Sequence, residues 1–91
     1  MEKKIDYVGI EKKVNEIIAS TLTDINADEV KADAKFVEDM GADSIDILEI
    51  CLEIEKEYGF YVDDVEFEMM KKETPQDFYD LVYARLSCIE P

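Results

Sequence analysis

Hydrophobic residues recur at intervals of three and four near the start of the chain. At about 100° per residue they fall on one side of a helix, which is the pattern of an amphipathic helix packed against a core. The stripe consists of Ile10, Val14, Ile17, Ile18 and Leu22. We therefore expect a first helix over residues 10–22.

The next segment, residues 24–35, mixes small and charged residues without a period, which predicts a long loop. Phe36 and Val37 follow this segment and are expected to anchor the loop in the core. Gly41 then permits a tight turn, because glycine adopts positive φ angles at little cost.

A second helix is predicted over residues 44–58, with signals at both of its ends. Asp43 is suited to be its N-cap, and Asp46 places a negative charge in the first turn, where the helix dipole favours it. Gly59 is a typical C-terminal stop. This is the segment with the most complete set of local signals.

The rest of the chain predicts a short third helix over residues 63–70 and a longer last helix. The third helix would take its apolar surface from Val65, Phe67, Met69 and Met70. The last helix should begin with Thr74 as N-cap, Pro75 at the first helical position and Asp77 in the first turn. Its apolar stripe consists of Phe78, Leu81, Val82 and Leu86, and it should fray before Pro91.

Together these elements predict an all-α fold, a small four-helix bundle with three main helices and a short third helix. With 91 residues, the chain has room for one modest core, so we expect a single domain over residues 1–91 with its core over about residues 7–88.

The predicted second helix has apolar residues on two sides. Its core face consists of Ile47, Ile50, Cys51, Ile54 and Tyr58, and a second stripe on nearly the opposite side consists of Ile45, Leu48 and Leu52. An acidic border of Asp46, Glu49 and Glu53 lies beside the second stripe. An exposed stripe with this border would dock and orient a basic protein. The alternative is that the bundle buries both faces, and the burial of Leu48 and Leu52 decides between the two.

The composition restricts the function. A net charge of -14 repels nucleic acid and anionic lipid and attracts basic proteins, and the absence of histidine removes the usual general base. No apolar run is long enough to insert into a membrane. Cys51 and Cys88 follow neither a metal-ligand nor a disulfide pattern, so we expect free thiols, Cys51 in the core and Cys88 in the tail. These features predict a cytoplasmic, non-catalytic monomer without a metal site.

Ser44 lies immediately after the expected N-cap, where its hydroxyl should point outward. A phosphate attached there would lie at the positive end of the helix dipole, near free backbone N–H groups. The position of Ser44 alone does not show that it carries a phosphate, because a serine at a helix start is more often a capping or surface residue.

The residues around Ser44 add a specific resemblance. The run 36–46, Phe-Val-Glu-Asp-Met-Gly-Ala-Asp-Ser-Ile-Asp, resembles the signature of the acyl carrier protein family, and the similarity extends over about residues 10–86. The resemblance implies that a phosphopantetheinyl transferase attaches 4'-phosphopantetheine from coenzyme A to Ser44, with Asp43 assisting. It also implies that acyl groups are carried on the thiol of this arm and that Ile45, Leu48 and Leu52 contact partner enzymes. The partners would be the transferase and acyl-transferring or condensing enzymes with basic surfaces.

The strongly acidic second helix favours a role in fatty acid biosynthesis. One alternative is a specialised carrier for polyketide, nonribosomal peptide or aminoacyl transfer. The other is an unmodified acidic helical module whose second stripe binds a partner. Three departures from the family pattern follow the second helix. Asp63 follows Val62 where a proline is common, and residues 70–74 are a little longer than usual, which both bear on the third helix. Phe67 is also bulkier than usual, which bears on the length of the cargo. Phe67 would narrow the space between the second and third helices, where acyl chains shelter in this family.

Overall fold

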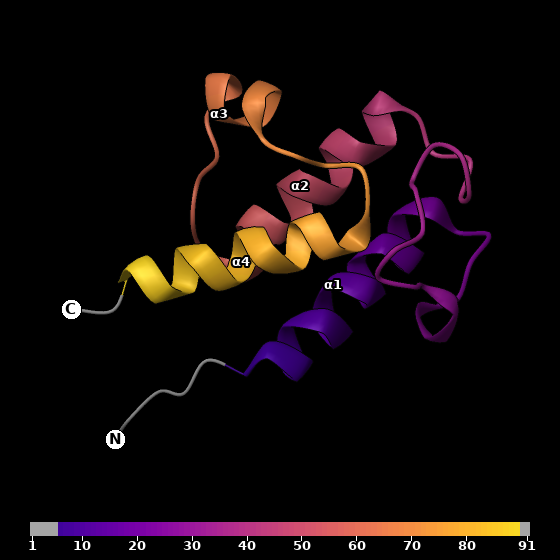
Figure 1. The fold of residues 1–91 in the computed structure, drawn as a ribbon, viewed down its shortest axis with the longest axis horizontal. Coiled ribbons are helices and arrows are strands. Elements are labelled where there is room, and N and C mark those ends of the chain that lie inside the picture. Colours follow the sequence, from indigo (N-terminus) through magenta and orange to yellow (C-terminus); the bar gives the residue numbers. More distant parts are fainter. Residues whose placement is uncertain (1–5, 90–91) are drawn as a thin grey trace.

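The computed structural model describes the backbone of residues 6–89 and the side chains of residues 6–87 (Figure 1). Within this part of the chain the structure is all-helical, which confirms the predicted fold class. The elements are α1 (Tyr7–Leu22), the 3-10 turn η1 (Ala27–Glu29), α2 (Ser44–Tyr58), α3 (Asp64–Met69) and α4 (Pro75–Ile89). The predicted fraying before Pro91 and the side chain of Cys88 lie outside the described residues.

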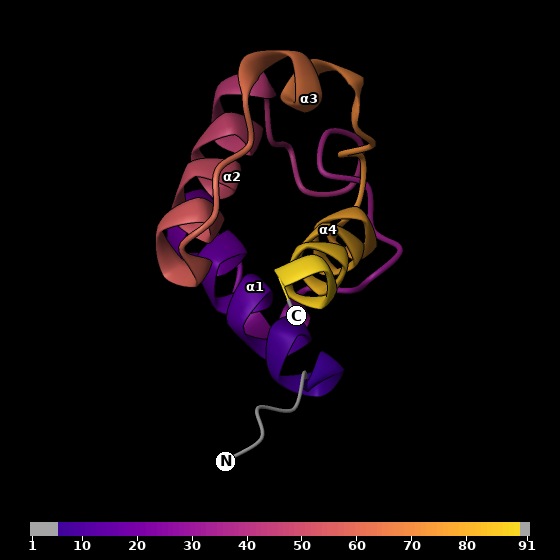
Figure 2. The ribbon, with the colours of Figure 1, turned by 90° about the vertical axis from the view of Figure 1, so that its left-hand side faces the viewer.

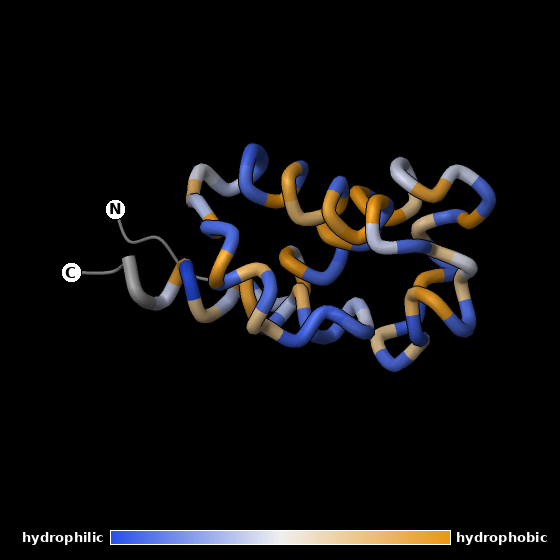
Figure 3. Tube along the Cα trace, turned by 90° about the horizontal axis from the view of Figure 1, so that it is seen from above, coloured by the Kyte–Doolittle hydropathy of each residue, from blue (hydrophilic) through white to orange (hydrophobic). Residues whose placement is uncertain are grey.

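Three helices surround one core, and the fourth covers it. The helix α1 packs against both α2 and α4. Figure 2 shows α3 on the side away from α1, where it bridges from α2 to α4. Hydrophobic and hydrophilic residues alternate along the helices in Figure 3, as expected of helices with one buried side.

The core contains most of the residues that the helical periods predict. The residues of α1, α2 and α4 that lie below a tenth exposure are Ile10, Val14, Ile18, Ile47, Ile50, Cys51, Ile54, Pro75, Phe78, Tyr79 and Val82. Tyr79 is outside the predicted stripe of α4. It is buried because its ring packs edge-on against Tyr7 at 6.3 Å between centroids, and its hydroxyl donates a hydrogen bond to Asn15.

The helix α1 begins at Tyr7, three residues before the predicted start. The extra turn brings the Tyr7 hydroxyl to Asp80, to which it donates a hydrogen bond of 3.0 Å, so the start is fixed by α4 and not by a local signal. At its other end α1 is capped by Thr23, which has a φ of 65°.

The prediction that Val37 anchors the long loop is wrong. Phe36 is fully buried, but Val37 is 62% exposed, because residues 36–40 form a turn in which neighbouring side chains point in different directions. Val30 is the second anchor, at 7% exposure, and it directly follows η1. The expected irregular loop therefore contains a short 3-10 turn, closed by a capping box between Asn26 and Glu29.

The third helix is one residue shorter at each end than predicted, and only half of its expected apolar surface is used. Phe67 and Met70 pack partly against the core, whereas Val65 and Met69 are 68% and 81% exposed. Residues four apart share a face of a helix, so Val65 and Met69 together lie on the outer side of α3. No described helix is long and apolar enough to cross a membrane.

Candidate functional site

The start of α2 is held by a reciprocal capping box. The Asp43 carboxylate accepts a hydrogen bond of 3.0 Å from the backbone N–H of Asp46, and the Asp46 carboxylate accepts one of 3.2 Å from the backbone N–H of Asp43. The predicted N-cap is confirmed, and Asp46 has a second structural role that the charge pattern alone did not reveal. The first turn is therefore fixed in place.

The segment that leads into α2 is tied to the other end of the chain. The backbone N–H of Phe36 donates to the carbonyl of Glu73 at 2.9 Å, and the Phe36 ring packs against Phe78 at 5.8 Å between centroids. The N–H of Ala42 donates in turn to the carbonyl of Phe36 at 2.8 Å, across the turn that Gly41 makes with a φ of 70°. The approach to Ser44 is thus anchored in the core.

Ser44 is the first residue of α2 and its side chain is exposed. The free N–H groups of the first turn and the positive end of the helix dipole favour a phosphate at this position. The carboxylate of Asp43 lies on the adjacent residue and is oriented by the cap. The residues present therefore fit a phosphodiester-linked group, because the hydroxyl is accessible and its helix supplies an anion-stabilising field.

The second stripe of α2 faces solvent. Ile45, Leu48 and Leu52 are 65%, 42% and 46% exposed, whereas the core face is buried except for the half-buried Tyr58. The alternative that the bundle buries both faces is therefore wrong. Exposed aliphatic side chains in a row are a typical feature of protein-interaction surfaces.

The acidic border lies beside this stripe, with Glu49 and Glu53 exposed and Asp46 half-buried at the cap. A surface groove of about 730 Å³ adjoins Leu52 and these two glutamates. Its other wall includes Ser20 and Thr21 at the end of α1, which the sequence analysis did not single out. Both residues lie outside the apolar stripe of α1, and only the packing of α1 on α2 brings them to this surface.

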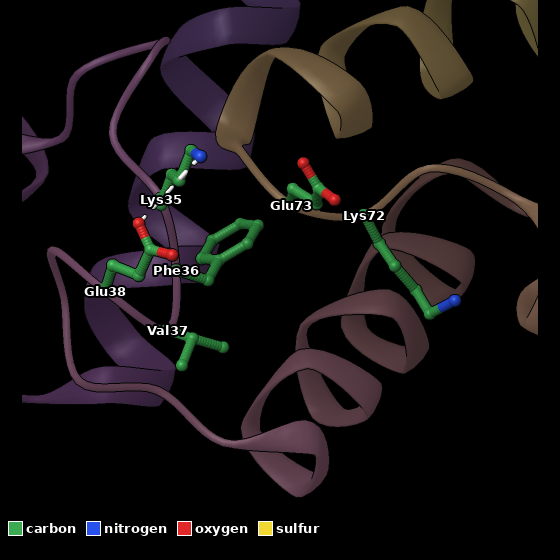
Figure 4. Close-up of a pocket in the computed structure, with 6 residues that line it drawn as sticks. All are labelled: Lys35, Phe36, Val37, Glu38, Lys72 and Glu73. Atoms are coloured by element: carbon green, nitrogen blue, oxygen red, sulfur yellow. Dashed lines mark ion pairs between the residues drawn. The ribbon is translucent and has the colours of Figure 1, made fainter.

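A smaller hollow of about 240 Å³ lies between the segment before α2 and the linker from α3 to α4 (Figure 4). Its two ammonium groups already have partners. Lys35 pairs with Glu38 at 3.8 Å, and Lys72 donates to the carbonyl of Phe67 at 2.6 Å at the end of α3. The hollow thus joins two loops, and both of its ammonium groups are already engaged with protein oxygens.

The thiol of Cys51 lies in the core, as predicted, at 1% exposure. Burial, together with the carboxylates of Glu55 and Glu66, raises the pKa of this thiol to about 11. Such a thiol is not ionised at neutral pH and is a poor nucleophile. Among the described residues no cluster of three or more acidic or cysteine side chains is placed to hold a metal ion.

Comparison with known proteins identifies similar chains. Residues 12–82 match the family described as "Phosphopantetheine attachment site". The acyl carrier protein of Nitratidesulfovibrio vulgaris strain Miyazaki F is 40% identical over 65 residues, which are 71% of this chain and 84% of that protein. The acyl carrier protein of Bdellovibrio bacteriovorus is 40% identical over 70 residues, which are 77% of this chain and 86% of that protein.

Proposed function

This chain belongs to the acyl carrier protein family, and from that premise we propose that Ser44 is the residue that carries its 4'-phosphopantetheine arm. The protein is a non-catalytic carrier of acyl groups, and the arm supplies the thiol to which they are bound. The observation that carries the assignment is the exposed hydroxyl of Ser44 at the capped start of α2, inside the matched residues 12–82.

Asp43 assists the attachment in this proposal. Its carboxylate is held at the N-cap by the N–H of Asp46, directly beside Ser44. In this place it can orient or deprotonate the serine hydroxyl when a transferase binds. The hydroxyl oxygen of Ser44 accepts the arm, and the transferase provides the catalytic groups other than Asp43.

The test is intact-mass measurement after incubation with coenzyme A and a broad-specificity phosphopantetheinyl transferase. The wild-type chain should gain one arm, and Ser44→Ala should gain none. Ser87→Ala is a matched control, because Ser87 is also an exposed serine within a helix, α4, and should not affect the gain. An unmodified wild-type chain would favour the alternative of an acidic interaction module without an arm.

The partner surface in this proposal is the second stripe with its acidic border. The exposed side chains of Ile45, Leu48 and Leu52 supply contact area, and Asp46, Glu49 and Glu53 attract basic surfaces of the transferase and of acyl-transferring or condensing enzymes. These contacts should weaken as salt screens the charges.

Charge reversal tests this surface. The double change Glu49→Lys and Glu53→Lys should slow attachment and acyl transfer, because the altered charges repel a basic partner. The free energy of unfolding should change by less than about 0.5 kcal/mol, since both side chains are exposed. Asp28→Lys with Asp33→Lys makes the same change in net charge outside α2 and should leave the rates near normal. Equal slowing by both pairs would show an effect of net charge and not of this surface.

The pathway that we propose is fatty acid biosynthesis, in the cytoplasm and with the carrier as a monomer. The support is the acidic α2, the similarity to proteins named acyl carrier protein, and the free thiol of Cys51. Loading of the modified chain by a malonyl-transferring enzyme of fatty acid synthesis would bear this out. Loading only by an enzyme that activates amino acids would favour the specialised carrier.

A further inference from the structure

The helix α3 is the least embedded of the four helices described. It has six residues and none of them is buried, whereas α2 buries four residues. A helix of this length is not stable in water alone, so its position must come from contacts outside it. Figures 1 and 2 both show it on the outer side of the space between α2 and α4.

One side chain of α4 joins α4 to this region through two polar contacts. The guanidinium of Arg85 pairs with the carboxylate of Glu66 in α3, and it donates a hydrogen bond of 2.8 Å to the carbonyl of Tyr61. It also lies 5.3 Å from the centre of the Phe60 ring. Arg85 is the only arginine in the sequence. Its ion pair is half-buried, at 25% and 37% side-chain exposure, so it is screened less than a surface pair.

Cys51 lies on the side of α2 that α3 covers. Its thiol is buried, and besides Glu55 of α2 the charges that act on it come from α3, the following linker and α4, through Glu66, Lys72 and Arg85. On the same side the Glu55 carboxylate accepts a hydrogen bond of 2.9 Å from the N–H of Val62, just before α3. If α3 moved away, Cys51 would be among the first core atoms to meet water.

We infer that Arg85 is a latch that holds α3 against α2 and α4, and that α3 opens as a local unit when this side chain releases Glu66 and Tyr61. The contacts of Arg85 all lie within residues 60–66, so losing them removes the polar tie between α4 and this segment. The hydrogen bond from Val62 to Glu55 and the packing of α1 on α2 and α4 stay in place. The inference goes beyond the attachment of the arm and does not depend on it.

The experiment measures how fast Cys51 reacts with a thiol reagent. The 91-residue chain carries Ser44→Ala and Cys88→Ser, so that Cys51 is its only thiol and no arm is present. At low urea concentrations the rate of Cys51 reaction should exceed the rate that global unfolding alone would give. This rate should also change little with the urea concentration. Arg85→Gln should raise the rate about tenfold, the effect of losing a charge-assisted contact. Arg85→Lys should raise it less, because an ammonium keeps the charge but cannot reach both partners.

Lys13→Gln is the matched control. It also removes a cation that pairs with a glutamate, Glu57 of α2, but it makes no contact with α3 and should leave the rate within twofold of the parent. Circular dichroism checks that each variant is folded. If Arg85→Gln does not fold, the variant Glu66→Gln replaces it in the test. We expect Glu66→Gln to raise the rate of Cys51 reaction severalfold. A rate that follows global unfolding at every urea concentration, or an unchanged rate in both latch variants, would overturn the inference.

Discussion

The helices α2 and α3 follow one another in the chain, but they are held in different ways. The helix α2 has a reciprocal cap at its start, a glycine stop with a φ of 74° at its end, and four buried side chains. The helix α3 has a capped start at Asp63, no buried residue, and a tether from Arg85. The helix that presents the proposed attachment point is fixed by its own sequence and by four buried side chains. The helix α3 is held by the partial packing of Phe67 and Met70 and by polar contacts, among them the ion pair with Arg85.

This difference matches the two tasks of a carrier. In the proposed function, a partner enzyme must find Ser44 and its surroundings in one arrangement, which a helix packed along its length provides. The interior must also be able to respond to cargo, and a short helix with few buried contacts can move at low free-energy cost.

The largest expected contrast comes from truncating one apolar side chain on each helix. Ile54→Ala in α2 removes a fully buried side chain and should lower the free energy of unfolding by about 2–5 kcal/mol. Met69→Ala in α3 removes one that is 81% exposed and should change it by less than about 0.5 kcal/mol. Urea unfolding followed by circular dichroism measures both. Similar losses would mean that α3 is as firmly packed as α2.

Alkaline pH gives the next largest effect and tests how well α3 covers Cys51. The pKa of this thiol is raised to about 11 in the folded protein, so the unfolded chain loses its proton first. The contribution of this thiol to stability is therefore fully present below about pH 9 and is lost as the pH rises through 11, by about 2–3 kcal/mol in all.

Urea unfolding at several pH values measures this loss, with Cys51→Ala as the comparison. Burial also raises the pKa values of Tyr58 and Tyr79, and these two groups titrate in both proteins. The difference in slope therefore belongs to Cys51. If α3 opens without global unfolding, the thiol ionises in the open form. The free energy of unfolding then stops falling at a pH below 11. Identical slopes would mean that the thiol is not protected in the folded state.

The two N-caps provide the smallest contrast. Asp43 and Asp63 both accept a hydrogen bond from the backbone N–H three residues later, at 3.0 and 2.8 Å. Asp43→Ala should lower the free energy of unfolding by about 1 kcal/mol, and Asp43→Asn should lower it less, because asparagine can also cap. For Asp63→Ala the loss in the free energy of unfolding cannot exceed the free energy of opening α3. We expect this loss to be smaller than the loss for Asp43→Ala. Equal losses in urea unfolding would remove the distinction between the helices.

The parts of the fold that local signals control could be predicted from the sequence. The bounds of α2 follow from Asp43 and Gly59, and its two faces follow from the helical period. The exposure of Ser44 follows from its place after the cap. Each of these depends only on residues within a few positions of one another.

The parts that depend on distant residues could not be predicted. The early start of α1 requires the partners of Tyr7 in α4, and the position of α3 requires Arg85, nineteen positions after Glu66. The sequence predicts Val37 as an anchor because this residue is aliphatic and adjacent to Phe36. In the structure the two residues lie in a turn and their side chains point in different directions, which residue types alone do not reveal.

Thr23, which ends α1, lies in the left-handed region with a φ of 65°. A β-branched residue is strained there, and glycine would adopt the same backbone angles freely. The strain is local, and the Thr23 side chain is exposed. Replacing this residue is therefore a simple way to stabilise the fold: Thr23→Gly should raise the melting temperature. The added tolerance would let more disruptive redesigns of the partner surface remain folded.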